Sequence, residues 1–365
     1  MLEGPPGHGD AQDARVLDLT GAQLSSLADE VLIQTDLREL RLDHNQLESL
    51  PEPLCSLARL EQLHVDGNRL TQLPDLIRKL TKLSTLSAYG NQVGSLPESI
   101  GELTSLTHLS LGSNRLVSLP ESLWRLANLR TLNLGQNELS AVSEGLGRLT
   151  RLRMLDLGHN ALTQCPDALE DLSDLRLLYL SHNRLSSLPR SLGRLGRLTY
   201  LNVADNHLTA VPEELGELGG LLELRLSSNR LRSLPASLGT LPRLRELHVG
   251  GNVLSALPEA FGQLVELRKL VLEGNALTAL PETIGSLSSL SELTVRNNRL
   301  VSLPGSVGDL SQLVSLDLRA NRLASLPDTI GQLPRLQRLD LRWNKLASRP
   351  AWLQLLEERG CTVFT

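Results

Sequence analysis

The sequence predicts an α/β solenoid in which a short parallel strand and a helical return alternate many times. Asparagine recurs at a constant step of 23 residues along almost the whole chain, and leucines hold fixed places within each step. Self-similarity at such a period indicates stacked repeats and overrules the two or three ordinary domains that 365 residues would suggest. Only 2% of the residues are aromatic, so the core must be built mainly from leucine.

The recurring asparagines form a ladder without insertion or deletion. Its members are Asn45, Asn68, Asn91, Asn114, Asn137, Asn160, Asn183, Asn206, Asn229, Asn252, Asn275, Asn298, Asn321 and Asn344. One step before the first of them, Ala22 takes this place in a terminal copy that keeps the leucines. An asparagine at the end of a strand carries both a donor and an acceptor, so we expect it to satisfy backbone groups that a turn leaves unpaired.

Each repeat reads as a strand followed by a helical return. Before the asparagine, apolar and polar residues alternate, which predicts a strand with Leu109 and Leu111 inward and His108 and Ser110 outward. After it, leucines three or four apart predict a loose or 3₁₀-like turn. In thirteen of the fourteen repeats, proline stands six residues after the asparagine, and Ser143 is the exception. Proline, often followed by an acidic residue, suits the start of a helical turn.

This pattern, LxxLxLxxNxLxxLPxxIGxLxx, resembles the leucine-rich repeat, and its 23-residue form is similar to the intracellular class of Ras-associated scaffold families. The resemblance covers residues 14 to 350. The resemblance implies a right-handed horseshoe with a parallel concave β-sheet and short helical or 3₁₀ convex segments. It also implies that the protein binds other proteins, as signalling scaffolds do. The cysteine caps of extracellular members are absent at both ends, which favours the intracellular class.

The repeats predict how the chain is divided. We expect a flexible polar tail over residues 1–13, a capping repeat over 14–36, regular repeats over 37–350, and a cap of one helix and a short strand over 351–365. An uncapped repeat would expose apolar surface, which is why caps are expected at both ends. We expect the protein to be a monomer.

The location follows from cysteine usage and from the lack of targeting signals. The three cysteines, Cys55, Cys165 and Cys361, are isolated and odd in number, so they fit neither a metal-binding pair nor a disulfide framework. No basic segment followed by an apolar stretch opens the chain, and no apolar run approaches the roughly 18 residues of a membrane helix. These observations predict a cytoplasmic protein without a membrane segment.

Charge and motifs exclude several function classes. A net charge of −5 gives no basic excess for binding nucleic acid. The sequence contains no nucleophile elbow, phosphate loop, zinc-protease motif or dinucleotide fingerprint, so we expect no enzyme, cofactor or metal.

A purely structural role is one alternative to an intracellular binding scaffold, and it predicts that Met154, Leu177, Tyr179 and Tyr200 can be replaced by serine without loss of any interaction. Two further alternatives remain. One is the substrate-recognition module of a bacterial effector-like ubiquitin-ligase system, but only fifteen residues follow Pro350, too few for a catalytic domain. The other is an extracellular-type ligand-binding receptor module. That class predicts a signal peptide, glycosylation sequons and disulfide caps, none of which the sequence shows.

The alternation also predicts which residues meet a partner. Side chains six, four and two positions before each asparagine point out of the sheet, and residues that share such a column lie about 4.8 Å apart on adjacent strands. Three apolar residues follow one another in the first column, and all three tyrosines of the chain map to this face. Aromatic residues with a polar tip are typical binding anchors. The predicted partner-binding residues are Met154, Leu177, Tyr179, Tyr200, Tyr89, Asp156 and Asn202.

An alternative interpretation is that Met154, Leu177 and Tyr200 only pack against one another across the strands. Contiguous exposed apolar surface favours binding instead.

Two further clusters are weaker candidates. His159, His182 and Asp205 share the column just before the asparagine, with His207 nearby, which would suit a metal or a proton sensor. We favour unrelated loop residues, since stacked columns bring any residue types together.

A column of arginines, Arg296, Arg319 and Arg342, with Asp317 and Asp340 between them, is the second candidate and would attract an acidic partner. Arginines scattered elsewhere in the repeats indicate that such positions are often simply solvated.

Overall fold

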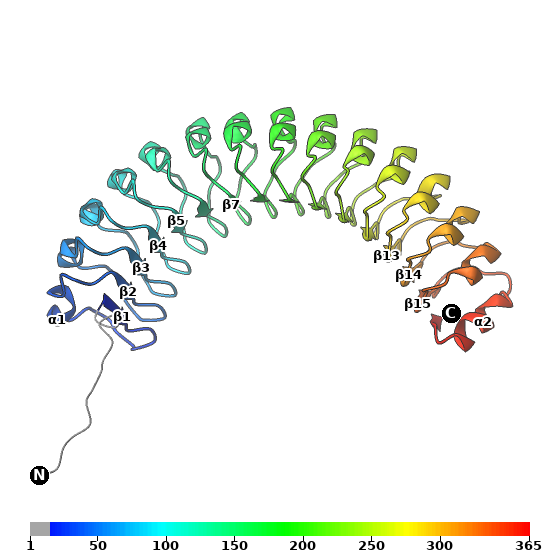
Figure 1. The fold of residues 1–365 in the computed structure, drawn as a ribbon, viewed down its shortest axis with the longest axis horizontal. Helices are drawn as coiled ribbons and strands as arrows, with labels where there is room; N and C mark the ends of the chain where they lie inside the picture. Colours follow the sequence, from blue (N-terminus) through cyan, green and yellow to red (C-terminus); the bar gives the residue numbers. More distant parts are fainter. Residues whose placement is uncertain (1–14) are drawn as a thin grey trace, which may run out of the picture. The chain divides into compact units, whose positions relative to one another are not determined.

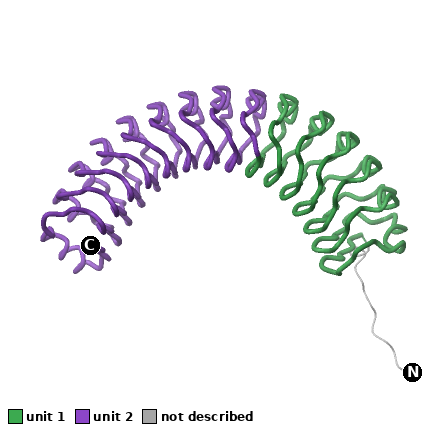
Figure 2. Tube along the Cα trace, turned by 180° about the vertical axis from the view of Figure 1, so that it is seen from behind, with its two compact units in different colours: residues 1–160 green, residues 161–365 purple. Residues whose placement is uncertain are grey.

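The computed structural model describes residues 15–365, which fall into two compact units, and each unit is described by itself (Figure 2). Unit 1 is Met1–Asn160 and unit 2 is Ala161–Thr365. The tail predicted for residues 1–13 lies outside the described residues.

Unit 1 contains seven three-residue strands in parallel, in chain order. The strands are β1 (Val16–Asp18), β2 (Glu39–Arg41), β3 (Gln62–His64), β4 (Thr85–Ser87), β5 (His108–Ser110), β6 (Thr131–Asn133) and β7 (Met154–Asp156). The helical segments are α1 (Asp29–Leu32) and the 3₁₀ turns η2 (Glu52–Ser56), η3 (Asp75–Lys79), η4 (Glu98–Glu102), η5 (Glu121–Arg125) and η6 (Glu144–Arg148).

Unit 2 repeats the arrangement with nine parallel strands. They are β8 (Leu177–Tyr179), β9 (Tyr200–Asn202), β10 (Glu223–Arg225), β11 (Glu246–His248), β12 (Lys269–Val271), β13 (Glu292–Thr294), β14 (Ser315–Asp317), β15 (Arg338–Asp340) and β16 (Thr362–Phe364). The 3₁₀ turns are η7 (Asp167–Asp171), η8 (Arg190–Arg194), η9 (Glu213–Glu217), η10 (Ala236–Thr240), η11 (Glu259–Gln263), η12 (Glu282–Ser286), η13 (Gly305–Asp309) and η14 (Asp328–Gln332), and helix α2 (Trp352–Glu358) precedes β16.

Strands line the inner side of each unit and 3₁₀ turns line its outer side (Figure 1). Successive repeats pair in register, so that Leu63 lies opposite Leu86 and Leu224 opposite Leu247. The central residue of almost every strand is buried, and the flanking residues are partly exposed on what we call the inner face. The parallel sheet and the 3₁₀ returns confirm the predicted fold class.

The asparagine ladder holds each tight turn that follows a strand. The side-chain oxygen of every ladder residue accepts the amide hydrogen of the residue 21 positions earlier, at 2.9–3.1 Å. The amide of Asn229, for example, donates to the carbonyl oxygens of Val203 (3.0 Å) and Leu226 (3.1 Å). The residue before each ladder asparagine has a positive φ, such as 54° at His182, a conformation that is uncommon for residues other than glycine. The ladder bonds lie within this turn.

Glycines on the outer side let the repeats approach closely. A Cβ on Gly101 would lie 2.2 Å from the carbonyl oxygen of Ser122 in the next repeat. Trp124 occupies the same place one repeat later, and Gly145 faces it: a Cβ there would lie 2.2 Å from the Trp124 Cδ1 atom. In this repeat Ser143 replaces proline, and its Oγ accepts the amide hydrogen of Gly145 at 3.2 Å.

Replacing Asn229 by alanine should lower the free energy of unfolding by roughly 1–3 kcal/mol, because the amide of Leu208 and two carbonyl oxygens lose their partner in a buried place. Urea unfolding followed by circular dichroism measures the change. A Ser228→Ala variant is the matched control, because this exposed neighbour is outside the ladder. Equal stability of the two variants would contradict the role assigned to the ladder.

Candidate protein-binding surface

An aromatic pair lies on the inner face of unit 2. The ring centroids of Tyr179 on β8 and Tyr200 on β9 are 4.9 Å apart, with an interplanar angle of 41°. The guanidinium carbon of Arg225 lies 5.9 Å from the centroid of the Tyr200 ring. Leu177 pairs in register with Tyr200. The side chains of Leu177, Tyr179 and Tyr200 are all half-buried. We call Leu177, Tyr179 and Tyr200 the tyrosine patch.

The remaining predicted apolar positions lie in unit 1. Met154 begins β7 and is half-buried. Tyr89 follows β4, with β5 and β6 between it and β7, and is 38% exposed. The ring of Tyr89 lies over Gly112, where a Cβ would be 2.9 Å from the Tyr89 Cδ2 atom. The predicted contact between Met154 and the tyrosine patch stays a prediction.

Asp156 and Asn202 bind their own strand ends. Asp156 Oδ1 accepts the amide hydrogen of Gly158 at 2.8 Å, and Asn202 Oδ1 accepts that of Ala204 at 3.0 Å. Asn133, at the same place in the repeat before Asp156, makes the same bond at 3.0 Å. Burial raises the pKa of Asp156 above its ordinary value, although the Gly158 hydrogen bond acts in the opposite direction. These side chains therefore stabilise the turn as well as line the inner face.

The arginine column of unit 2 is ion-paired within the chain. Arg296 binds Glu273. Arg319 Nε and Nη2 donate to Asp317 at 2.9 and 2.6 Å. Because these charges are neutralised by neighbours on the same face, the column has less capacity to attract an acidic partner than its sequence suggests.

Asp340 is the centre of the last of these clusters. Its side chain is fully buried and accepts hydrogen bonds from Arg342 Nε (3.0 Å) and Nη2 (2.7 Å). Arg319 Nε and Arg338 Nη2 lie 3.4 and 3.6 Å from its Oδ2 atom. Burial opposes ionisation, but the hydrogen bonds from Arg342 and the charge of Arg319 outweigh it and hold the pKa of Asp340 below its usual range. The carboxylate therefore anchors the guanidinium groups.

The histidine column is part of the turn. His159, His182 and Asp205 have φ values of 53°, 54° and 55°, as every residue before a ladder asparagine has a positive φ. His182 Nε2 lies 3.5 Å from Asp205 Oδ2, and both side chains are more than a third exposed. His159 belongs to unit 1. This geometry supports their interpretation as turn residues.

A group of charged and polar side chains on the inner face of unit 2 was not predicted from the sequence. Glu223 and Arg225 on β10 and Glu246 and His248 on β11 lie beside the tyrosine patch. The signal was present in the sequence, as Glu-Leu-Arg and Glu-Leu-His at the same place in consecutive repeats.

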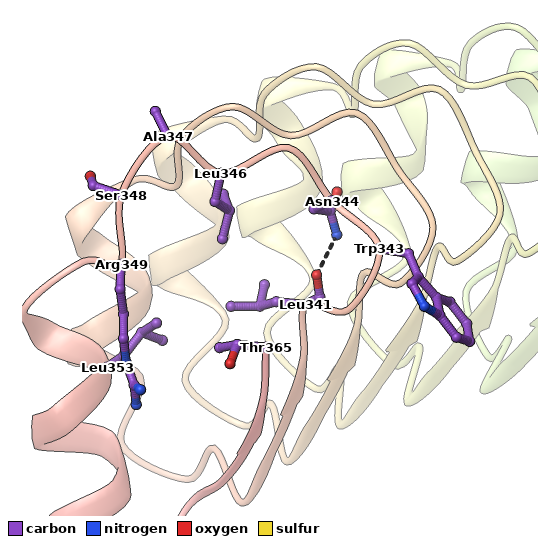
Figure 3. A pocket seen from close by; sticks show the side chains of 9 residues that line it. All are labelled: Leu341, Trp343, Asn344, Leu346, Ala347, Ser348, Arg349, Leu353 and Thr365. Carbon is purple, nitrogen blue, oxygen red and sulfur yellow. Dashed lines mark hydrogen bonds between the residues drawn. The ribbon is translucent and has the colours of Figure 1, made fainter.

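A pocket of about 410 Å³ opens beside the last ladder asparagine (Figure 3). Asn344 Nδ2 donates to the Leu341 carbonyl oxygen at 2.8 Å on one side of it. Trp343 stands at its rim with 72% of its surface exposed. Leu346 is partly exposed here, whereas its counterpart Leu323 is fully buried, because a helix and not another 23-residue repeat follows.

These observations define the class of protein: a solenoid of 23-residue repeats whose short strands form a parallel sheet. The family described as "Leucine-rich repeat region" matches residues 9–144, 136–261 and 258–358. The chain belongs to the leucine-rich repeat family.

Solved structures place the chain among known relatives. A leucine-rich repeat protein of Leptospira interrogans is 34% identical, with a TM-score of 0.90, over 97% of this chain and 96% of that chain. The plant peptide hormone receptor RGFR1, in complex with RGF2, is 27% identical, with a TM-score of 0.62, over 90% of this chain and 63% of the receptor chain. A chain of the Toll–Spatzle complex of Drosophila is 26% identical, with a TM-score of 0.78, over 88% of this chain and 46% of the Drosophila chain.

Among curated proteins, none matches this chain. Within residues 15–365, no helix is both long and apolar enough to cross a membrane.

An Asp156→Asn variant should be more stable than the parent at pH 7. Because burial raises the pKa of Asp156, the folded state holds the proton more tightly than the unfolded state, and ionisation above the ordinary aspartate pKa costs stability. Asparagine keeps the turn bond, as Asn133 shows. The urea midpoints of unfolding of the parent and of the Asp156→Asn variant should differ at pH 7 and converge near pH 3. The reciprocal Asn133→Asp variant should lose stability at pH 7, and a less stable Asp156→Asn protein at pH 7 would refute the explanation.

An Asp340→Asn variant should behave in the opposite way. The pKa of Asp340 is lowered in the folded state, so its contribution is complete above the ordinary aspartate pKa and is lost as the pH falls through the folded-state value. We expect the substitution to cost roughly 1–3 kcal/mol at pH 7, because hydrogen bonds to a buried charge are lost. Urea unfolding at pH 7 and at pH 2 measures the loss. A cost that does not shrink in acid would contradict this assignment.

Proposed function

We propose that this protein is a scaffold or adaptor that binds a protein partner on the inner face of unit 2. The observation that carries the proposal is the tyrosine patch, in which two tyrosine rings at 4.9 Å are half-buried on the sheet and remain accessible on one side. Tyrosine, with an apolar ring and a polar tip, is among the residues that most often dominate binding energy.

The backbone beneath the patch is already ordered. Tyr179 and Tyr200 lie on paired strands, and the ladder bonds of Asn183 and Asn206 hold the turns that follow them. A rigid surface loses little conformational entropy on binding, so more of the contact energy contributes to affinity. The inner face is therefore suited to recognising a folded partner or an extended peptide.

The relatives support binding as the mode of action. The plant receptor RGFR1 is described in complex with RGF2, and the Drosophila relative in complex with Spatzle. For this chain we propose binding and not catalysis, and a partner of the kind that Ras-associated scaffolds suggest, such as a small GTPase in a signalling pathway.

We also propose that the protein acts as a monomer in the cytoplasm. Its three thiols are free, and two of them, Cys55 and Cys361, are buried. Burial raises the pKa of Cys55 to about 11 and that of Cys165 to about 12. Such thiols stay protonated and unreactive at neutral pH, as suits a reducing compartment.

Replacing Leu177, Tyr179 and Tyr200 together by serine should abolish capture of the partner from a lysate of the source cells. The substitutions remove the apolar contact area but leave the buried leucines and the ladder intact. A matched control replaces three other exposed apolar residues, Val253, Val265 and Val301, by serine and should still capture the partner. Capture by the first variant and loss with the second would overturn the placement of the surface.

A further inference from the structure

Three metal-ligand side chains converge on the inner face of unit 2. One ligand atom from each of Glu223, Glu246 and His248 lies within 4.8 Å of the other two. Among the described residues, this is the one group of three or more histidine, cysteine or acidic side chains with such spacing. His248 Nε2 lies 3.0 Å from Glu246 Oε2, and the His248 side chain is only 15% exposed. The strand pairing of β10 and β11 fixes the three Cα positions.

The ligand set indicates which ion would fit. One imidazole nitrogen and two carboxylate oxygens suit zinc and similar divalent transition metals, whereas magnesium and calcium prefer oxygen ligands alone. Three protein ligands leave at least one coordination position for water or another ligand. All three residues are partly exposed, so an ion can reach the group from solvent.

Neighbouring cations do not block the site. Arg225 Nε donates to Glu223 Oε1 at 2.5 Å, which leaves the Oε2 atom of the same carboxylate as a donor to a metal. Lys269, which pairs in register with Glu246, places its Nζ atom 3.1 Å from Glu292. Among the described residues, Arg225 is the only arginine or lysine paired with Glu223 or Glu246. With His248 neutral, as a metal ligand must be, the two carboxylates and Arg225 together carry one net negative charge for the ion.

We propose that Glu223, Glu246 and His248 form a binding site for a divalent transition metal of the zinc type. The site is independent of the protein partner proposed above. A bound ion would lie next to Arg225 and so beside the tyrosine patch.

Unit 1 contains a near-copy of the site that lacks one ligand. Glu39 and Arg41 on β2 and Gln62 and His64 on β3 hold the same four places, with Glu39 opposite Gln62 and Arg41 opposite His64. Arg41 Nε donates to Glu39 at 2.5 Å, as Arg225 does to Glu223. His64 Nε2 lies 3.4 Å from Gln62 Oε1, so a carboxamide stands where the other site has a carboxylate. The group in unit 1 is therefore an internal control that lacks one ligand, and replacing Gln62 by glutamate would supply that ligand.

The test is zinc binding to the full, untagged, chelator-treated chain, measured by isothermal titration calorimetry and by metal content after dialysis. The parent should bind one equivalent of Zn²⁺, and Zn²⁺ should raise its unfolding temperature. Glu246→Gln and His248→Ala should each weaken binding by more than about tenfold and abolish the thermal shift. Gln62→Glu should bind a second equivalent. Circular dichroism without metal checks that each variant is folded.

The three cysteines stay in every variant, so zinc bound by thiols would be unaffected by these substitutions. No zinc binding by the parent, or equal binding by the parent and by both ligand variants, would overturn the proposal. An unchanged stoichiometry in Gln62→Glu would contradict the claim that these three donors at this spacing are sufficient.

Discussion

Hydrogen bonding at the turn after each strand is the constraint on which the structure depends. The chain turns after each strand from β2 to β15 through a residue with positive φ, and backbone groups of the turn, such as the amide of Leu208, depend on the asparagine side chain for a partner. The asparagine side chain supplies an acceptor for an amide 21 residues earlier and donors for carbonyl oxygens of two repeats. One residue type thereby closes a turn and joins it to its neighbour, which explains why the period admits no insertion.

This constraint separates structural from functional positions. Leucines fill the core and asparagines hold the turns, while residues six, four and two positions before each asparagine vary without disturbing either. Variation there produced a tyrosine pair, arginine–carboxylate clusters and a histidine–glutamate group on one scaffold. Even so, some inner-face residues still serve the turn, as Asp156 and Asn202 show.

Much of the fold follows from the period of the sequence. The spacing of Asn183 and Asn206 was enough to place Tyr179 and Tyr200 on adjacent strands, where their rings lie 4.9 Å apart. Ion pairs were not predictable in this way, because a long guanidinium such as that of Arg319 selects among several carboxylates by its rotamer. Burial of Asp340 was not predictable from the alternation, because the side chains of Arg319, Arg338 and Arg342 gather around its carboxylate. Beside it, β16 pairs with β15 at an offset of 24 residues, outside the regular period, and the guanidinium carbon of Arg338 lies 4.7 Å from the centroid of the Phe364 ring.

The most direct test of the central claim, that the inner face of unit 2 binds a protein, is site-specific photo-crosslinking. A photoreactive phenylalanine analogue replaces Tyr200 in one protein and the exposed Val265 in another. We predict that the analogue at position 200 forms a covalent adduct with a partner protein and that the one at position 265 does not. Adducts from position 265 alone would show that the partner binds elsewhere and would contradict the account.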